Sequence, residues 1–287
     1  MKIFLTGATG YIGSRVLPAL TAAGHSVTAL VRTDSVRGDG MTAVVGDMRD
    51  RDLVGRLASD ADAVIALATP GDATSAAADD DFVGAVLARL RPGATLIRTG
   101  GIWVYGSGAD ITERKPLDAP PIVAWREAVD NRALTAPGIR SLLIEPGIVY
   151  GYGTGIPALL FGGRRTDDGL ELIGPGTQHW TTVHVDDLAE LYVAALTQGD
   201  SGQRFIGVGG ENPTVREMGE AVSRRLGLGG RVVPEDATAT VERLGEFGAA
   251  LLLDQQASGE KARRELSWKP TRPSLLAEID SGAYDPS

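Results

Sequence analysis

The chain has 287 residues, no cysteine, three histidines and a formal net charge of -9. The absence of cysteine excludes disulfides and thiolate chemistry. Because His25, His179 and His184 lack the spacing of a zinc-binding helix, we also expect no metal site. The negative charge argues against nucleic acid and anionic membranes as partners. The apolar run before Gly7 is too short for a signal peptide, and no segment approaches the roughly 20 apolar residues of a membrane span, so a cytoplasmic location is expected.

The first half of the chain alternates between strand and helix patterns, which predicts a parallel sheet with right-handed crossovers. An acidic run at Asp79, Asp80 and Asp81 is interpreted as the N-terminus of a helix, where carboxylates cap free amides. The expected strands are 3–5, 27–31, 42–45, 63–67, 95–98 and 141–144, and the expected helices are 12–23, with Pro18 inside it, 50–58, 82–90 and 125–135.

Beyond Gly147 the composition changes. Residues 151–176 are rich in glycine and are predicted to be mainly a long loop, and Asp186 or Asp187 is expected to cap the helix that follows. Further elements are expected at 185–196, 204–208, 215–226 and 261–266. The predicted fold class is therefore α/β. A doubly wound Rossmann sheet takes residues 1–150, with 182–208 returning to it, and a smaller substrate-binding region takes 151–181 and 209–287.

A glycine-rich turn lies between the first expected strand and the first expected helix. It reads Gly7-Ala8-Thr9-Gly10-Tyr11-Ile12-Gly13. Glycines at this spacing let the backbone approach a pyrophosphate, and the amides and dipole at the helix start stabilise its negative charge. The turn therefore predicts a dinucleotide site that includes Thr9, Tyr11 and Ile12.

The residue after the second strand indicates which dinucleotide is bound. An acidic side chain there would accept hydrogen bonds from the ribose 2′-hydroxyl, but this chain has Arg32, which can pair with a 2′-phosphate. Thr33 and Ser35 can add hydroxyl donors and Arg37 can add charge, so NADP(H) is favoured over NAD(H). After the third strand, Asp47 and Met48 are candidates for the adenine end, with a simple turn aspartate as the alternative for Asp47.

Together these motifs resemble the extended and atypical short-chain dehydrogenase/reductases, the NAD-dependent epimerase/dehydratase group. The matching segments, in order, are 6–13, 46–50, 104–106, 146–151, 180–189 and 266–270. The resemblance implies a Rossmann fold with further cofactor contacts at Leu67, Ala68, Thr99, Pro146, Gly147 and Ile148. It also implies a cleft for a small-molecule substrate and leaves a homodimer open.

The catalytic motifs depart from this family. Gly101 stands where the family has a serine, the segment 122–130 lacks the family's Tyr-x-x-x-Lys pair, and Glu145 replaces an arginine. Four residues are candidates for the missing chemistry: Thr99, Tyr105, Arg126 and His179. Arg126 lies near the place of the lysine, and His179 is the candidate that titrates near neutral pH. For each residue a purely structural role is the alternative.

The leading hypothesis is an NADP(H)-dependent reductase of a carbonyl, imine or activated double bond. The alternatives are a nucleotide-sugar epimerase or dehydratase, and a non-catalytic NADP-binding sensor. Four aromatic residues are candidates for the wall of an apolar or aromatic substrate pocket, with core packing as the alternative: Trp103, Trp125, Tyr152 and Trp180.

Overall fold

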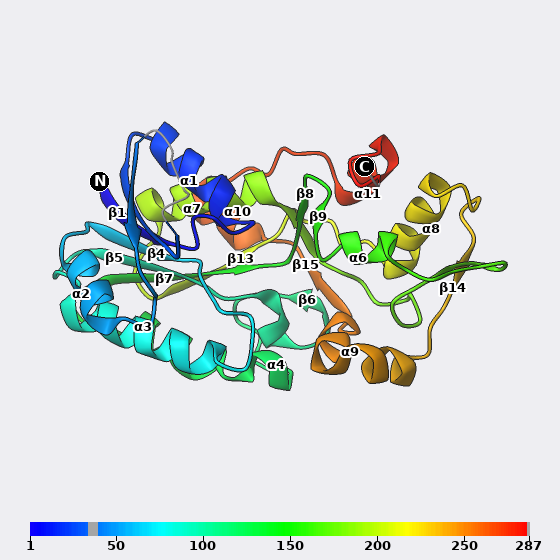
Figure 1. Cartoon of the computed structure of the whole chain (residues 1–287), viewed down its shortest axis with the longest axis horizontal. Helices are drawn as coiled ribbons and strands as arrows, with labels where there is room; N and C mark the ends of the chain where they lie inside the picture. The colour runs from blue at the N-terminus through cyan, green and yellow to red at the C-terminus, as the bar shows by residue number, and fades with distance from the viewer. Residues whose placement is uncertain (34–39, 286–287) are drawn as a thin grey trace.

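The computed structural model describes residues 1–33 and 40–285. Its centre is a seven-stranded sheet in the order β13-β7-β5-β4-β1-β2-β3, and every neighbouring pair is parallel (Figure 1). The chain order reverses between β1 and β4, and the predicted Rossmann-like α/β fold is thereby confirmed. The strands are β1 (Lys2–Thr6), β2 (Ser26–Val31), β3 (Met41–Val45), β4 (Ala63–Ala66), β5 (Thr95–Thr99), β7 (Arg140–Pro146) and β13 (Gln203–Gly207).

Helices cover both faces of this sheet, and for that reason its strands are apolar on both sides. Ile3, Leu5 and Ile65 face one core, whereas Phe4 and Val64 face the other. The first face carries α1 (Gly13–Ala22), α7 (Val185–Gln198) and α10 (Glu260–Leu266), and the second carries α2 (Arg51–Ser59), α3 (Ser75–Arg89) and α5 (Arg126–Leu134).

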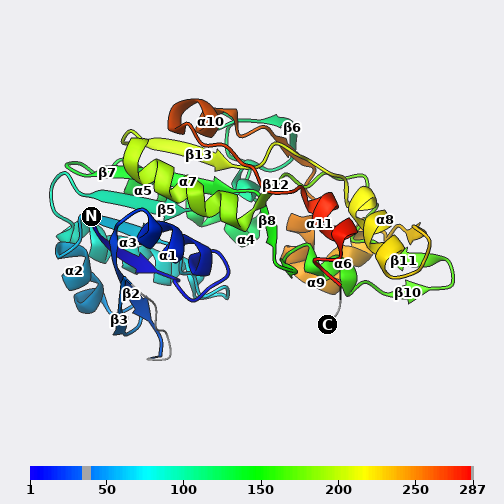
Figure 2. The same cartoon turned by 90° about the horizontal axis from the view of Figure 1, so that it is seen from above.

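The short strands and helices of the second half of the chain gather at the end of the molecule opposite the N-terminus, around α11 (Figure 2). They have their own apolar core, which includes Ile148, Leu172 and Trp180. The elements of this end are β8 (Ile148–Gly151), β9 (Thr154–Gly155), α6 (Ala158–Phe161), β10 (Arg165–Thr166), β11 (Gly169–Glu171), β12 (Thr182–His184), α8 (Val215–Arg225), β14 (Val232–Val233), α9 (Ala237–Leu251) and α11 (Leu275–Ser281).

Four further short elements connect the two parts: η1 (Ile102–Tyr105), β6 (Gly108–Ile111), α4 (Pro121–Ala124) and β15 (Gln255–Ala257). Helix α10 and Trp268 pack into the core of the large sheet, although the domain boundaries predicted from the sequence placed residues 209–287 in the smaller region. The chain therefore returns to the large sheet a second time, after β15.

The acidic-cap interpretation of Asp79, Asp80 and Asp81 is wrong. The helix begins earlier, at Ser75, whose hydroxyl accepts hydrogen bonds from the amides of Gly71 and Asp72. Asp79 is buried inside the helix, because its carboxylate pairs with the buried Arg98 of β5.

The helix expected at 125–135 is confirmed by α5, and the separate one-turn helix α4 precedes it. Two other local expectations need correction. The segment 151–176 contains three short strands, β9, β10 and β11, and the one-turn helix α6 in addition to loops. Helix α7 is capped by His184, whose side chain accepts the amide of Asp186. The Asp187 carboxylate instead accepts hydrogen bonds from the backbone amides of Thr271 and Arg272. These bonds anchor the segment after α10.

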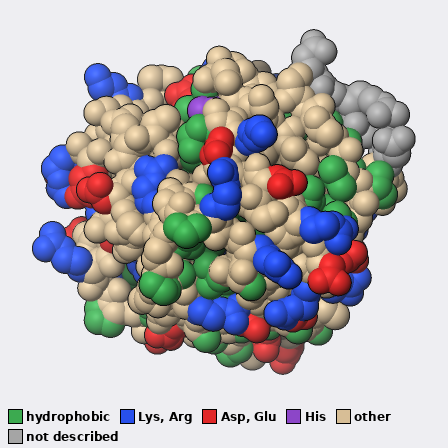
Figure 3. Space-filling model, turned by 90° about the vertical axis from the view of Figure 1, so that its left-hand side faces the viewer, with side chains coloured by type: hydrophobic (Ala, Val, Ile, Leu, Met, Phe, Trp, Pro, Cys, Tyr) green, Lys and Arg blue, Asp and Glu red, His purple; other side chains and the backbone are tan. Residues whose placement is uncertain are grey.

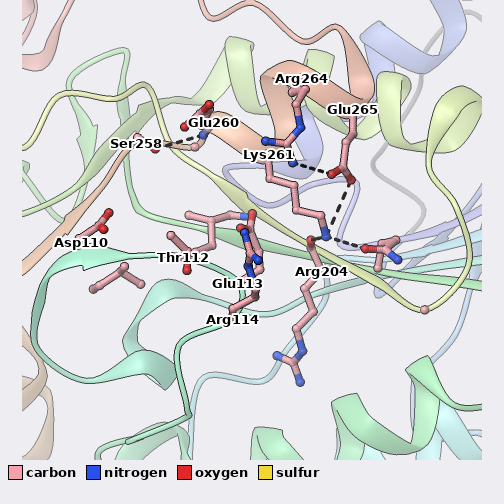
Figure 4. Close-up of a pocket in the computed structure, with 15 residues that line it drawn as sticks. Asp110, Thr112, Glu113, Arg114, Arg204, Ser258, Glu260, Lys261, Arg264 and Glu265 are labelled. Carbon is pink, nitrogen blue, oxygen red and sulfur yellow. Dashed lines mark hydrogen bonds and ion pairs between the residues drawn. The ribbon is translucent and has the colours of Figure 1, made fainter.

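The outer edge of β13 borders a cavity of about 640 Å³ between α10 and the segment after β6 (Figure 4). Two charged side chains form hydrogen bonds with backbone groups of this edge strand. Glu113 Oε1 accepts the Ile206 amide at 2.9 Å, and Lys261 Nζ donates to the Arg204 carbonyl at 2.8 Å.

The end of the molecule that carries the N-terminus and α2 presents Lys and Arg interspersed with Asp and Glu (Figure 3). On this face the excess of acidic groups is therefore not gathered into one patch. Within the described part of the chain, no helix combines the length and apolar character that crossing a membrane requires.

Candidate active site

The glycine loop after β1 is shaped by close backbone contacts. Gly7 has a φ of +73°, and a Cβ on Gly13 would lie 1.9 Å from the Gly7 carbonyl oxygen. Both positions therefore require glycine for the fold itself. Gly10 differs, because its φ is not positive and its Cβ would approach the Gly7 carbonyl only to 3.3 Å. The glycine at this exposed position is better explained by the approach of a ligand, and this loop fits a dinucleotide pyrophosphate.

This loop forms one wall of a cavity of about 530 Å³ at the carboxyl ends of β1 and β4, where the strand order reverses. Such switch points are the ligand sites of open parallel sheets, and the volume lies in the range of cofactor pockets. The predicted cofactor residues that line the cavity are Gly7, Thr9, Gly10, Tyr11, Ile12, Gly13, Arg32, Asp47, Met48, Leu67 and Ala68.

Five predicted cofactor residues are not part of this lining. Thr99, Pro146, Gly147 and Ile148 follow or end the neighbouring strands β5 and β7, and Thr33 follows Arg32. A Cβ at Gly147 would lie 2.4 Å from the Thr181 carbonyl, so the packing of that loop already explains its glycine. Ser35 and Arg37, proposed as phosphate donors, lie outside the described residues.

Two guanidinium groups line the cavity beside the ends of β2 and β3, and of these the sequence argument identified Arg32 but not Arg49. Arg49 donates from its side chain to both carboxylate oxygens of Asp47, at 3.0 and 2.7 Å. Hydrogen bonds from Arg49, with the charge of Arg32 as a smaller contribution, lower the pKa of Asp47 to about 2. Asp47 is thus ionised and engaged with Arg49, which could have been suspected from its place two residues after Asp47.

Thr99 and Arg126 are brought together at the carboxyl end of β5. Arg126 donates from Nη1 to the Thr99 carbonyl at 3.1 Å, and its guanidinium lies 4.9 Å from the centre of the Trp125 ring. Burial lowers the pKa of Arg126, partly offset by the charges of Asp79 and Asp130. The Thr99 hydroxyl is 2.6 Å from the hydroxyl of Tyr192 on α7, a partner that sequence reasoning missed.

Only one hydrogen bond of the Arg126 side chain is made within the described residues. A guanidinium has five N–H donors, so several of those of Arg126 remain available to a ligand. Because the side chain is already half-buried, a ligand that binds these donors removes little further water from it. A network beneath it fixes its surroundings: Arg98, buried in β5, pairs with Asp79 and Asp130 at 3.1 and 2.8 Å.

Tyr105 is fully buried, and its hydroxyl donates to Glu145 Oε2 at 2.6 Å. Arg204 donates to the other oxygen of this carboxylate at 2.7 Å. Burial raises the pKa of Glu145 to about 7 despite both partners. The tyrosine is thus engaged inside the protein, which supports the packing alternative for Tyr105 over proton delivery.

His179 is held on a different segment from Thr99 and Arg126. Its Nδ1 is 2.8 Å from Asp254 Oδ1, its backbone amide donates to the same oxygen, and its carbonyl accepts the Gln255 amide. These contacts join it to the chain that leads into β15. His184 fixes the junction of β12 and α7 through its Nδ1, which accepts the Asp186 amide, and through Nε2, which is 3.1 Å from Glu278.

Tyrosine hydroxyls connect the glycine loop with the smaller end of the molecule. Tyr11 donates to the Gly151 carbonyl at 2.9 Å, and Tyr284 accepts the Gly151 amide at 2.9 Å and donates to the Thr154 carbonyl. The hairpin of β8 and β9 is therefore tied both to the predicted dinucleotide site and to the segment after α11.

The glycine loop, the switch-point cavity and the two-part architecture define the class of the protein: a Rossmann-like domain with an appended region and a cavity at the place where such sheets bind dinucleotides. The model of the NAD dependent epimerase/dehydratase family matches residues 3–115. The predicted resemblance to that family is confirmed.

Curated relatives match over nearly the full length. An uncharacterized protein of Schizosaccharomyces pombe is 29% identical, covering 99% of this chain and 100% of the relative. A UDP-glucose 4-epimerase of Mycolicibacterium smegmatis is 29% identical, covering 94% of each chain. A 3-diazoavenalumate denitrifying reductase of a Streptomyces species is 27% identical, covering 96% of this chain and 97% of the relative.

Solved structures share the fold at lower identity. The UDP-glucose 4-epimerase of Thermus thermophilus in complex with NAD has a TM-score of 0.74 at 20% identity, covering 99% of this chain and 98% of that chain. The dTDP-glucose 4,6-dehydratase of Bacillus anthracis in complex with NAD has a TM-score of 0.77 at 18% identity, covering 99% of this chain and 95% of that chain.

Proposed function

We propose that this protein binds NADP(H) in the switch-point cavity and reduces a carbonyl, imine or activated double bond of a small molecule. The observation that carries the proposal is Arg126, a half-buried guanidinium at the carboxyl end of β5 with a single hydrogen bond to the Thr99 carbonyl among the described residues. It stands near the place where the related enzymes have the lysine of their Tyr-x-x-x-Lys pair. One curated relative is itself named as a reductase.

Bound NADPH supplies the hydride, and the chain supplies position and charge. The remaining N–H donors of Arg126 stabilise negative charge that develops on the substrate oxygen or nitrogen as the hydride arrives. The Thr99 hydroxyl, 2.6 Å from Tyr192, is held in one orientation beside it. Solvent is the ultimate source of the proton that completes the reduction. Tyr105 does not deliver it, because its hydroxyl donates to the buried Glu145.

The choice of NADP(H) rests on Arg32, with Arg49 close by in the same cavity. Asp47 is hydrogen-bonded to Arg49 at 2.7 Å, so Arg32 is the guanidinium proposed to pair with a 2′-phosphate. An arginine–phosphate hydrogen bond is worth about 1.5–3 kcal/mol, or roughly 10- to 100-fold in affinity.

Calorimetry on cofactor-stripped protein with NADPH and NADH tests the first half of the proposal. Loss of NADPH absorbance with a panel of ketones, imines and enones tests the second. Arg126→Gln is expected to lower kcat/KM about 100-fold with little change in the NADPH dissociation constant. Arg132→Gln is the matched control, because it lies on the same helix in an exposed ion pair with Asp80.

Equal loss of activity in both arginine variants would refute the assignment of Arg126. Turnover of a UDP- or dTDP-sugar without net oxidation of NADPH would favour the epimerase or dehydratase alternative. Tight NADPH binding without turnover of either substrate class would favour the sensor alternative.

A further inference from the structure

Two aromatic side chains from distant parts of the chain meet near the end of β5. Trp103 of η1 and Phe247 of α9 pack edge to face, with ring centroids 5.9 Å apart and an interplanar angle of 66°. Of the four aromatic residues that the sequence suggested for a substrate wall, Trp180 is buried in the core and Tyr152 lies beside Arg15 and Asp186 on the surface. Trp103 and Trp125 thus remain, and of these Trp103 has an aromatic partner that the sequence did not suggest.

This pair lies at the junction of the two parts of the molecule. Trp103 packs against the core of the smaller end and also against the cluster around Ile102 and Tyr105. Both Trp103 and Phe247 are only half-buried, unlike the core residues around them. Figure 1 shows α4 and α9 side by side at this junction, and α4 contacts both η1 and α9.

Between Thr99 and Trp103, the space beside Gly101 is unfilled among the described residues. Trp103 follows Thr99 by four residues, and Gly100 and Gly101 between them have no side chain. Among the described residues, a Cβ at Gly101 would meet no atom within 4 Å beyond its chain neighbours. The φ of Gly101 is 178°, an extended conformation open to any residue, so the fold does not require a glycine here.

The half-buried side chains on these three segments are apolar. They are Trp103, Ile122, Val123, Leu244, Phe247 and Ala249. Neither η1 nor α4 has a Lys or Arg, and the guanidinium of Arg243 on α9 is committed to Glu235 at 2.6 and 3.0 Å. This surface therefore lacks the cations that a diphosphate would need and instead offers aromatic faces.

The backbone of α9 sets the position of Phe247. Gly245 has a φ of +61° and a ψ of -143°, which interrupts the helix two residues before the ring. Its Cβ would meet no described atom within 4 Å, so the requirement for glycine is conformational. This kink lets the second half of α9 turn towards η1.

We propose that Trp103 and Phe247 are specificity-determining residues, against which a planar aromatic group of the substrate stacks while its reducible group reaches Arg126. The inference rests on the proposed reductase function and names its substrate class as uncharged aromatic carbonyl or related compounds. Stacking on an aromatic ring contributes more than the burial of a saturated group of similar size.

The test compares acetophenone with cyclohexyl methyl ketone, which have the same reacting group. Trp103→Leu and Phe247→Leu are each expected to lower kcat/KM for acetophenone about three- to tenfold more than for the saturated ketone, with an unchanged dissociation constant for NADPH. Phe161→Leu is the matched control, since Phe161 stacks on Tyr284 at the smaller end. Circular dichroism and melting temperature check that each variant folds.

A second measurement does not depend on turnover. Acetophenone is titrated calorimetrically into the protein saturated with NADP⁺, and its affinity is expected to exceed that of the saturated ketone and to fall in both variants. Aromatic binding without any turnover would uphold this inference and refute the reductase. Turnover with the same preference in wild type, Trp103→Leu and Phe247→Leu would overturn the inference and leave the reductase standing. Binding of neither ketone would overturn the inference as well.

Discussion

Glu145 makes the stability of this protein depend on pH in an unusual direction. Its carboxyl group is fully buried between Tyr105 and Arg204, and burial raises its pKa from 4.5 to about 7. The folded protein therefore holds a proton here that the unfolded chain releases above about pH 4.5. The contribution to the free energy of unfolding is fully present below that pH and is lost as pH rises to about 7.

The magnitude follows from the two pKa values. One pKa unit corresponds to about 1.4 kcal/mol, so the interval from 4.5 to about 7 corresponds to about 3 kcal/mol. Most of it falls between about pH 5 and about pH 8, where exposed carboxylates are already ionised. Burial also raises the pKa of Asp130, which contributes in the same direction.

Urea denaturation of wild type and Glu145→Gln at about pH 5 and about pH 8 measures this effect. Between these two pH values the wild type should lose about 2–3 kcal/mol more unfolding free energy than the variant. Glu171→Gln is the control, since Arg164 lowers the pKa of Glu171 and that carboxylate stays ionised over this range. An equal change with pH in wild type and Glu145→Gln would refute the reasoning.

Three further predictions concern the dinucleotide site and its connection to the smaller end. Gly10→Ala should weaken NADPH binding in calorimetry with little change in melting temperature, whereas Gly13→Ala should lower the melting temperature because its Cβ would lie 1.9 Å from a backbone oxygen; the reverse order would contradict the geometry. Arg32→Ala should weaken NADPH about 10- to 100-fold and NADH far less, and equal weakening of both would remove the case for NADP(H). Tyr284→Phe leaves the buried Gly151 amide without its 2.9 Å partner and should cost about 1–3 kcal/mol in chemical denaturation, while an unchanged midpoint would show that water replaces the hydroxyl.

Much of the Rossmann half could be predicted because its signals are local. The apolar run at Ile65 needs two covered faces, and the glycine loop carries its spacing on a single turn. The start of α3 was missed because Asp79 looks like a capping residue, and only the fold shows that Arg98 lies opposite it.

The candidate site was predictable only where one segment carries the chemistry. Arg126 was identified from its place on a helix, but Tyr192 and Phe247 come from segments 66 and 121 residues further along the chain, and no local pattern links them to Arg126. The same holds for Tyr105, because its commitment to Glu145 depends on the register between β7 and the segment that follows β5.

The charged side chains along β13 also affect how separate molecules behave at high concentration. An edge strand of a sheet normally offers unpaired amides and carbonyls, with which a strand from another chain can pair. Such pairing is a common start of fibril growth. Here the Ile206 amide is taken by Glu113 and the Arg204 carbonyl by Lys261. An incoming strand would have to displace both charges before it could pair, which makes this border of the sheet a poor template for aggregation.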